Sequence, residues 1–122
     1  MGMATADAQP LRSSLLGDPE IRELMPEFVA DLPAKVSQLA AILERADVET
    51  LRRHAHQLKG VGGTFGFMAL TDAAEKLELA IAEGRNIDEV AVLGLRLMDL
   101  IRTIDGYDAA NESLTGGVRK AA

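Results

Sequence analysis

The clearest structural signal in the chain is the stretch DVETLRRHAHQLKGVGGTFG at residues 47–66. It begins with Asp47, a residue type that commonly caps the N-terminus of a helix. Apolar residues then recur at the three- or four-residue spacing of a buried helix face, at Val48, Leu51, Ala55 and Leu58. The stretch ends in a group of glycines, so we predict one amphipathic helix that ends in a turn near Gly62 or Gly66.

Three other segments show the same helical period. The first is opened by Asp18 and Pro19, a capping residue followed by a residue type favoured in the first turn. Pro33 lies inside this segment and removes one backbone donor, so either the helix kinks there or two helices meet. The apolar positions of the three segments are Phe28, Leu32, Val36, Leu39 and Leu43; Leu70, Ala73, Ala74, Leu77 and Ile81; and Ile87, Val90, Gly94, Leu97, Ile101 and Ile104.

Periodicity and composition together predict the fold class. No segment alternates between apolar and polar residues over a useful length, as a half-buried strand would. Aromatic residues make up 3% of the chain and hydrophobic residues 48%, which favours helices built from Leu, Ala, Ile and Val. The connections between segments are short and therefore join antiparallel neighbours. We predict an all-α fold, an antiparallel up-and-down four-helix bundle over residues 27–107 with a short N-terminal helix near residues 19–25.

The chain length of 122 residues fits a single domain. Residues 1–17 have no sustained hydrophobic period, and we expect them to form a flexible lead. The bundle is expected to occupy residues 18–108. Residues 109–122 are expected to form a flexible tail, as chain ends commonly do.

The composition excludes several classes of function. With 13 Lys and Arg against 19 Asp and Glu, the net charge of −6 is unsuited to wrapping nucleic acid. The chain has no cysteine, which excludes disulfides and metal–thiolate sites, and we expect no metal site. No apolar run approaches the roughly 18–20 residues of a membrane span, and no secretory signal is evident. We therefore expect a cytoplasmic protein that binds neither nucleic acid nor membranes.

The outer face of the helix within residues 47–66 carries an unusual set of residues. At about 100° per residue, His56 lies about 130° from the mean direction of the apolar face, with Gly60 and Gly63 within about 40° of His56. Lys59 lies beside this stripe, while His54 lies on the flank of the helix. Because a helical glycine costs about 1 kcal/mol relative to alanine, these glycines serve stability poorly. They leave a bare surface on which another protein can approach an exposed imidazole, a nucleophile able to accept a phosphoryl group.

Each of these residues also has an ordinary structural interpretation. Most exposed histidines are simply solvated, and glycines near a helix end commonly form its C-cap. Arg52 and Arg53 are typical of a solvated helix face. The combination favours a functional site, because an outward histidine is followed by a lysine three residues later and a glycine four residues later.

The segment AHQLKG at residues 55–60, followed by Gly63 and by FG at residues 65–66, resembles the signature of the histidine-containing phosphotransfer (Hpt) domain family. The segment FVADLP at residues 28–33 is similar to the first long helix of that family, and EKLE at residues 75–78, together with Leu70, to the helix beside the histidine. The resemblance covers residues 18–107. It departs at residues 61–62, where the family often has Ser or another small polar residue.

The resemblance implies that His56 is phosphorylated, that Lys59 is the electrostatic partner of the phosphoryl group and that Gly60 is the gap that admits a receiver domain. Glu78 lies where the family often has a polar residue near the histidine, and is implied to orient the imidazole through a hydrogen bond. The implied docking surface consists of Arg53, Gln57, Gly60 and Gly63, joined by the nearby apolar residues Phe67 or Met68.

The chain lacks the sequence features needed to take a phosphoryl group from ATP. It has no phosphate-binding loop, no glycine-rich ATP lid and no Mg²⁺ carboxylate cluster in the motif region, so we expect a cofactor-free phosphocarrier rather than an enzyme. The implied partners are response-regulator receiver domains and a sensor histidine kinase or hybrid kinase, and we expect a monomer. Two alternatives remain open: a histidine-bearing domain of a larger hybrid or chemotaxis-type kinase, and a helical adaptor that is never phosphorylated.

Overall fold

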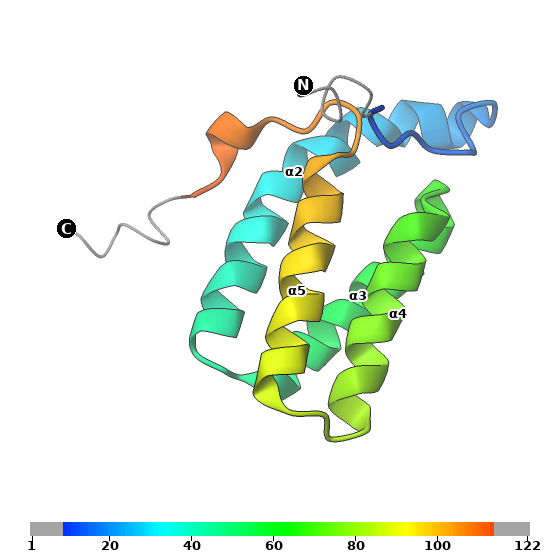
Figure 1. The fold of residues 1–122 in the computed structure, drawn as a ribbon. Coiled ribbons are helices and arrows are strands. Elements are labelled where there is room, and N and C mark those ends of the chain that lie inside the picture. The colour runs from blue at the N-terminus through cyan, green and yellow to red at the C-terminus, as the bar shows by residue number, and fades with distance from the viewer. Residues whose placement is uncertain (1–8, 114–122) are drawn as a thin grey trace, which may run out of the picture.

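The computed structural model describes residues 9–113, so residues 1–8 of the expected lead and 114–122 of the expected tail lie outside the described residues. Four α-helices make up most of it: α2 (Pro19–Glu44), α3 (Val48–Phe65), α4 (Met68–Ala82) and α5 (Ile87–Arg102) (Figure 1). A short 3-10 helix, η1 (Ala109–Asn111), follows α5. The described residues contain no strand, only an isolated bridge between Leu11 and Ile104.

The four helices form a closed bundle in which each helix packs against the next. Contacts run from α2 to α3, from α3 to α4, from α4 to α5 and from α5 back to α2. Because the loops are short, successive helices run antiparallel (Figure 1). The predicted all-α up-and-down bundle is confirmed. No helix in the described part of the chain is both long and apolar enough to cross a membrane.

The core is filled from the inner faces of all four helices. The predicted apolar positions that are fully or nearly fully buried are Leu32, Val36, Leu39, Leu51, Ala55, Leu58, Leu70, Ala74, Leu77, Val90, Leu97, Ile101 and Ile104. Phe28, Leu43, Ala73 and Ile81 are partly buried against this core, whereas Val48 and Ile87 are exposed, with fractions of 37% and 45%. Each is the first residue of its helix and lies at the edge of the core, so the hydrophobic stripe begins one turn later than the sequence pattern indicates.

The helix ends follow the signals in the sequence. The Asp18 side chain accepts a hydrogen bond from the backbone N–H of Glu20 at 2.9 Å, and Asp47 accepts one from the N–H of Thr50 at 3.2 Å. Gly66 ends α3 with φ of +83°, a left-handed conformation that glycine adopts without strain. The predicted caps and the predicted turn at Gly66 are confirmed.

The separate short helix predicted near residues 19–25 is absent, because those residues form the first turns of α2. Pro26 and Pro33 both lie inside this continuous helix. Each removes only one backbone donor, and Pro33 is fully buried beside Leu32, so packing offsets the loss. In Figure 1 the first turns of α2, drawn in blue, run across the end of the bundle before the helix turns down along α5.

The segments flanking the four helices contact the bundle where the structure describes them. The Leu11 N–H donates to the Thr103 carbonyl at 2.8 Å, and the Ser13 hydroxyl donates to the Phe65 carbonyl at 2.5 Å. After α5, Arg102 pairs with Glu112 at 2.7 Å. The expected domain boundaries at residues 17–18 and 108–109 stay a prediction, but residues on both sides of them are joined to the helices.

Candidate functional site

His56 lies near the middle of α3, on the face that points away from the core. Its side chain is 64% exposed, whereas Ala55 beside it is completely buried. Leu51 and Leu58, at helical spacing from Ala55, are buried as well and fix the orientation of the helix. The outward direction predicted for His56 from the spacing of the apolar residues is therefore confirmed.

A single carboxylate on α4 joins the two key side chains of α3. Glu78 Oε2 lies 2.9 Å from His56 Nδ1, and Glu78 Oε1 lies 2.9 Å from Lys59 Nζ. The Glu78 side chain is only 15% exposed, and that of Lys59 is 32% exposed. His56, Lys59 and Glu78 form what we call the His56 triad, in which a largely buried acid holds an exposed imidazole and a partly exposed ammonium.

The charges in the triad determine which ring nitrogen of His56 carries the hydrogen. The Lys59 ammonium lowers the pKa of Glu78 most strongly, and the His56 hydrogen bond lowers it further, while partial burial opposes them. Glu78 in turn raises the pKa of Lys59. Glu78 is therefore an ionised acceptor near neutral pH, and a carboxylate cannot donate a proton. In the neutral ring, the nitrogen facing this acceptor, Nδ1, therefore carries the hydrogen, and Nε2 keeps the lone pair.

Beyond His56, two positions on the outer face of α3, Gly60 and Gly63, carry no side chain. A Cβ added at Gly60 would meet no atom within 4 Å, and one at Gly63 would meet only Thr71 Oγ1, at 4.0 Å. Both glycines are exposed.

Gly62 differs from these two glycines. It lies within α3 rather than at its turn, and a Cβ there would lie 2.5 Å from Thr71 Oγ1 and 2.9 Å from the Phe67 carbonyl oxygen. Its role is close helix packing and not the turn that the sequence predicts.

The other residues expected to form a docking surface divide into exposed and buried ones. Gln57 and Arg53 are exposed, and Arg53 donates from Nη2 to Thr50 Oγ1 at 3.2 Å. Met68 is 58% exposed. Phe67 is only 2% exposed and stacks on Phe28, with ring centroids 5.8 Å apart. The expectation that Phe67 joins the surface is wrong, because its ring fills the core where α3 passes into α4.

His54 differs from His56 although both lie on α3. It is half-buried on the flank of the helix, as the spacing predicts. Burial lowers its pKa, and the cations Lys35 and Arg53 lower it further.

Thr71 is the residue at this site that the sequence reasoning missed. Its hydroxyl Oγ1 donates to the Lys59 carbonyl oxygen at 2.8 Å and so joins α4 to α3. The available signal was its position on α4, seven residues before Glu78 and therefore on the same helix face.

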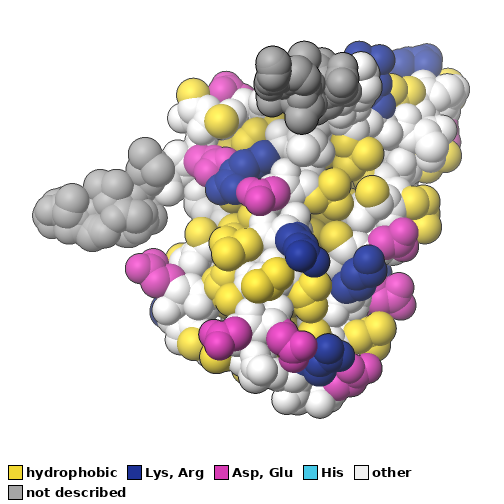
Figure 2. Space-filling model, in the orientation of Figure 1, with side chains coloured by type: hydrophobic (Ala, Val, Ile, Leu, Met, Phe, Trp, Pro, Cys, Tyr) yellow, Lys and Arg dark blue, Asp and Glu magenta, His cyan; other side chains and the backbone are white. Residues whose placement is uncertain are grey.

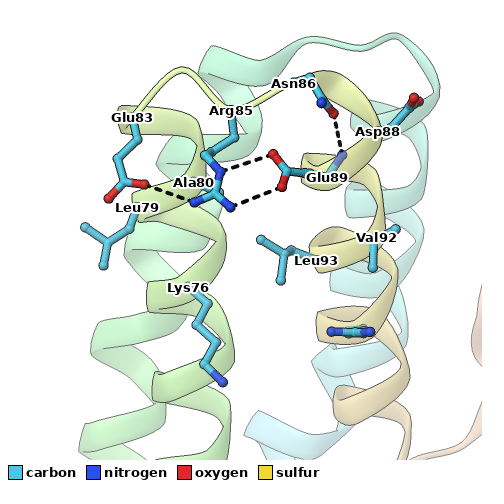
Figure 3. A pocket seen from close by; sticks show the side chains of 11 residues that line it. Lys76, Leu79, Ala80, Glu83, Arg85, Asn86, Asp88, Glu89, Val92 and Leu93 are labelled. Carbon is cyan, nitrogen blue, oxygen red and sulfur yellow. Dashed lines mark hydrogen bonds and ion pairs between the residues drawn. The ribbon is translucent and has the colours of Figure 1, made fainter.

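A groove between α4 and α5 lies apart from the His56 triad. Leu93 points into it from α5, Leu79 and Lys76 line it from α4, and Arg85 closes one end through bonds to Glu83 and Glu89 (Figure 3). Figure 2 shows the same side of the molecule as Figure 1, and no histidine is visible there. Within residues 9–113 no group of three or more His, Cys, Asp or Glu side chains is arranged to hold a metal ion.

Comparison with known proteins assigns the chain to a family. Residues 23–107 match the family model of the Hpt domain. Neither the curated proteins nor the solved structures yielded a match. The matched range contains all of α3, α4 and α5, most of α2 and the whole His56 triad. The chain belongs to the Hpt domain family, whose members are phosphocarrier modules of two-component phosphorelays.

Proposed function

We propose that His56 accepts a phosphoryl group from the aspartate of one receiver domain and passes it to the aspartate of another. The observation that carries this proposal is the exposed His56 ring, whose Nδ1 is bonded to Glu78 at 2.9 Å beside a glycine stripe. A ring held in this way presents a nucleophilic nitrogen, and a stripe without side chains leaves room for a partner.

The transfer step follows from the tautomer that Glu78 imposes. The Nε2 lone pair attacks the phosphorus of the receiver's acyl phosphate, forming an N–P bond as the P–O bond to the aspartate breaks. The aspartate leaves as a carboxylate, and the Nδ1 hydrogen stays with the ring. The imidazolium product keeps its hydrogen bond to the Glu78 carboxylate, which stabilises the added positive charge. The reverse attack by a second receiver's carboxylate regenerates neutral His56.

Lys59 is proposed to balance the charge of the phosphoryl group. This group carries nearly two negative charges at neutral pH. Lys59 lies one helical turn beyond His56 and is already held near the site by Glu78 Oε1 at 2.9 Å. A cation at this place attracts the acidic phosphate and stabilises the phosphorylated state once a docked partner excludes water.

The proposed docking surface consists of Arg53, Gln57, Gly60, Gly63 and Met68, all exposed around His56. The receiver would supply Mg²⁺ and most of the transition-state stabilisation. A sensor histidine kinase or hybrid kinase would supply the phosphoryl group to the first receiver, in the cytoplasm. Because the His56 triad comes entirely from one chain, we propose that the domain acts as a monomer.

The test is a transfer assay with a panel of receiver domains, each phosphorylated beforehand by a small acyl phosphate in the presence of Mg²⁺. We expect the chain to take up label that is lost in acid and retained in base, as a phosphoramidate is. A kinase autophosphorylated with ATP, added without a receiver, shows whether a kinase can act as direct donor. If phosphorylated receivers leave the chain unlabelled throughout the panel, the carrier function is rejected and the adaptor alternative is favoured.

A further inference from the structure

We propose that Thr71 is a positioning residue for phosphotransfer, because its hydrogen bond to the backbone of α3 sets the register that brings Glu78 to His56 and Lys59. This inference rests on the proposed function of His56. It concerns a residue of α4 that lies outside the signature segment of α3 and holds the backbone rather than a reacting group.

The first observation is that α4 holds Lys59 at two points. Thr71 Oγ1 donates to the Lys59 carbonyl oxygen at 2.8 Å, and Glu78 Oε1 pairs with the Lys59 ammonium at 2.9 Å. Thr71 and Glu78 are seven residues apart, which is two helical turns or about 10 Å along the axis of α4. The two contacts therefore fix both the position and the rotation of α4 relative to α3.

The second observation is the close approach of the two helices at this point. Gly62 has no side chain, and a Cβ there would lie 2.5 Å from Thr71 Oγ1 and 2.9 Å from the Thr71 backbone nitrogen. Ala74, which lies between Thr71 and Glu78 on α4, is completely buried, and so is Ala55 on α3. Small residues let the backbones come close enough for a short side chain such as threonine to reach the opposite carbonyl.

The third observation is how little displacement the triad tolerates. Glu78 makes two contacts of 2.9 Å with different oxygens, to His56 and to Lys59. Since hydrogen bonds weaken steeply beyond about 3.2 Å, a shift of α4 by a fraction of an ångström weakens one contact or both. Loss of the His56 contact frees the imidazole to exchange tautomers, and the Nε2 lone pair is then present only part of the time.

The experiment compares Thr71→Val, which keeps the branched shape without a donor, with Thr71→Ser, which keeps the donor. The matched control is Thr103→Val at the C-cap of α5, since Thr103 Oγ1 also donates to a carbonyl, that of Leu100 at 2.7 Å, and contacts no member of the triad. Nitrogen-15 NMR of the His56 ring reports the share of the Nδ1–H tautomer. Single-turnover transfer from a phosphorylated receiver, at a series of receiver concentrations, separates the maximal rate from the half-saturating concentration.

We expect Thr71→Val to reduce the Nδ1–H share and to lower the maximal transfer rate about fivefold, the scale of one hydrogen bond. The half-saturating receiver concentration should stay the same, because the docking surface is untouched. Thr71→Ser should restore both values, and Thr103→Val should match wild type. The inference is overturned if Thr71→Val melts at a lower temperature but keeps the wild-type tautomer share and maximal rate, because Thr71 would then only stabilise the bundle.

If Thr71→Val does not fold, Thr71→Ala takes its place, since alanine also lacks the donor and is the best helix former. The same two readouts then support or reject the inference. The imidazole spectrum needs no phosphorylation. If the wild-type chain accepts no phosphoryl group, the proposed function fails, and the spectra of the Thr71 variants still decide whether Thr71 holds the ring and its carboxylate together.

Discussion

On the inner face of α3, a Cβ at Gly62 would lie 2.5 Å from Thr71 Oγ1, whereas on the outer face a Cβ at Gly60 would meet no atom within 4 Å. The inner glycine is required by the fold of this chain. The outer glycine is not, although a glycine in a helix costs about 1 kcal/mol relative to alanine. Within residues 9–113 no neighbouring atom requires position 60 to lack a side chain, and our proposal gives the reason as the space that a docked receiver needs.

The two histidines of α3 repeat this contrast. His54, on the flank, is half-buried, and burial with two neighbouring cations lowers its pKa. His56 is 64% exposed and faces a carboxylate that fixes its tautomer. Residues two positions apart thus serve packing in one case and, by our proposal, transfer in the other.

The sharpest test of the inner face is Gly62→Ala. We expect it to destabilise the domain by about 1–3 kcal/mol, because α3 and α4 must separate to admit the methyl group, which outweighs the gain in helix propensity. Thermal and urea unfolding measure the change. Gly60→Ala is the matched control and should be slightly more stable than wild type. Equal stabilities for the two variants would show that the inner and outer glycines do not differ.

The outer face is tested by Gly60→Gln. A long side chain there projects into the space that a receiver must occupy, so we expect transfer to weaken at least tenfold, or about 1.4 kcal/mol. The isolated domain should be no less stable, since Gly60 has no positive φ and glutamine is a better helix former. Melting temperature and transfer rate are measured on the same protein. Normal transfer by this variant would remove the argument that the stripe is kept bare for docking.

A smaller effect is expected from Lys59→Ala. Removing the ammonium takes away the main cause of the lowered pKa of Glu78, which should rise, and leaves the phosphoryl group without its nearby cation. We expect transfer to slow by up to about fivefold, on the scale of a partly exposed ion pair, or the phosphohistidine to decay faster. Quenched-flow transfer and label decay measure both. Unchanged kinetics would make Lys59 an ordinary surface charge.

The smallest effect concerns the pH dependence that His54 adds to folding stability. Its pKa in the folded chain lies below the ordinary value of 6.5, so the folded state favours the neutral ring. The contribution is fully present above pH 6.5 and is lost as the pH falls through the lowered pKa. We expect His54→Gln to lose less stability than wild type between about pH 8 and about pH 5, as measured by urea unfolding. If the plots of unfolding free energy against pH were parallel for the variant and wild type, the His54 ring would be solvated rather than half-buried.

Much of this contrast could be predicted from the sequence because it depends on local spacing. The apolar period of residues 47–66 gives the orientation of α3, and Asp47 and Gly66 mark its ends. The same spacing places His56 outward without knowledge of the neighbouring helices. Glu78 could be assigned near His56 only through the family resemblance, since the two residues lie 22 positions apart on either side of a turn.

Features that depend on contacts between helices could not be predicted. Nothing in the local pattern distinguishes Gly62 from Gly60, because the difference is the distance to Thr71 on α4. Phe67 follows a glycine turn and looks exposed in sequence, yet its ring stacks on Phe28 of α2. The prolines of α2 predict an interruption, and only the buried surroundings of Pro33 explain why the helix continues.

The most direct test of the account is to phosphorylate the chain with an active receiver and compare His56→Gln with His54→Gln. We predict that His56→Gln takes up no acid-labile label while its melting temperature stays close to wild type, because exposed substitutions usually change stability by less than about 0.5 kcal/mol. His54→Gln should be labelled at the wild-type level. Labelling of His56→Gln, or loss of labelling in His54→Gln alone, would contradict the assignment of phosphotransfer to the outer face of α3.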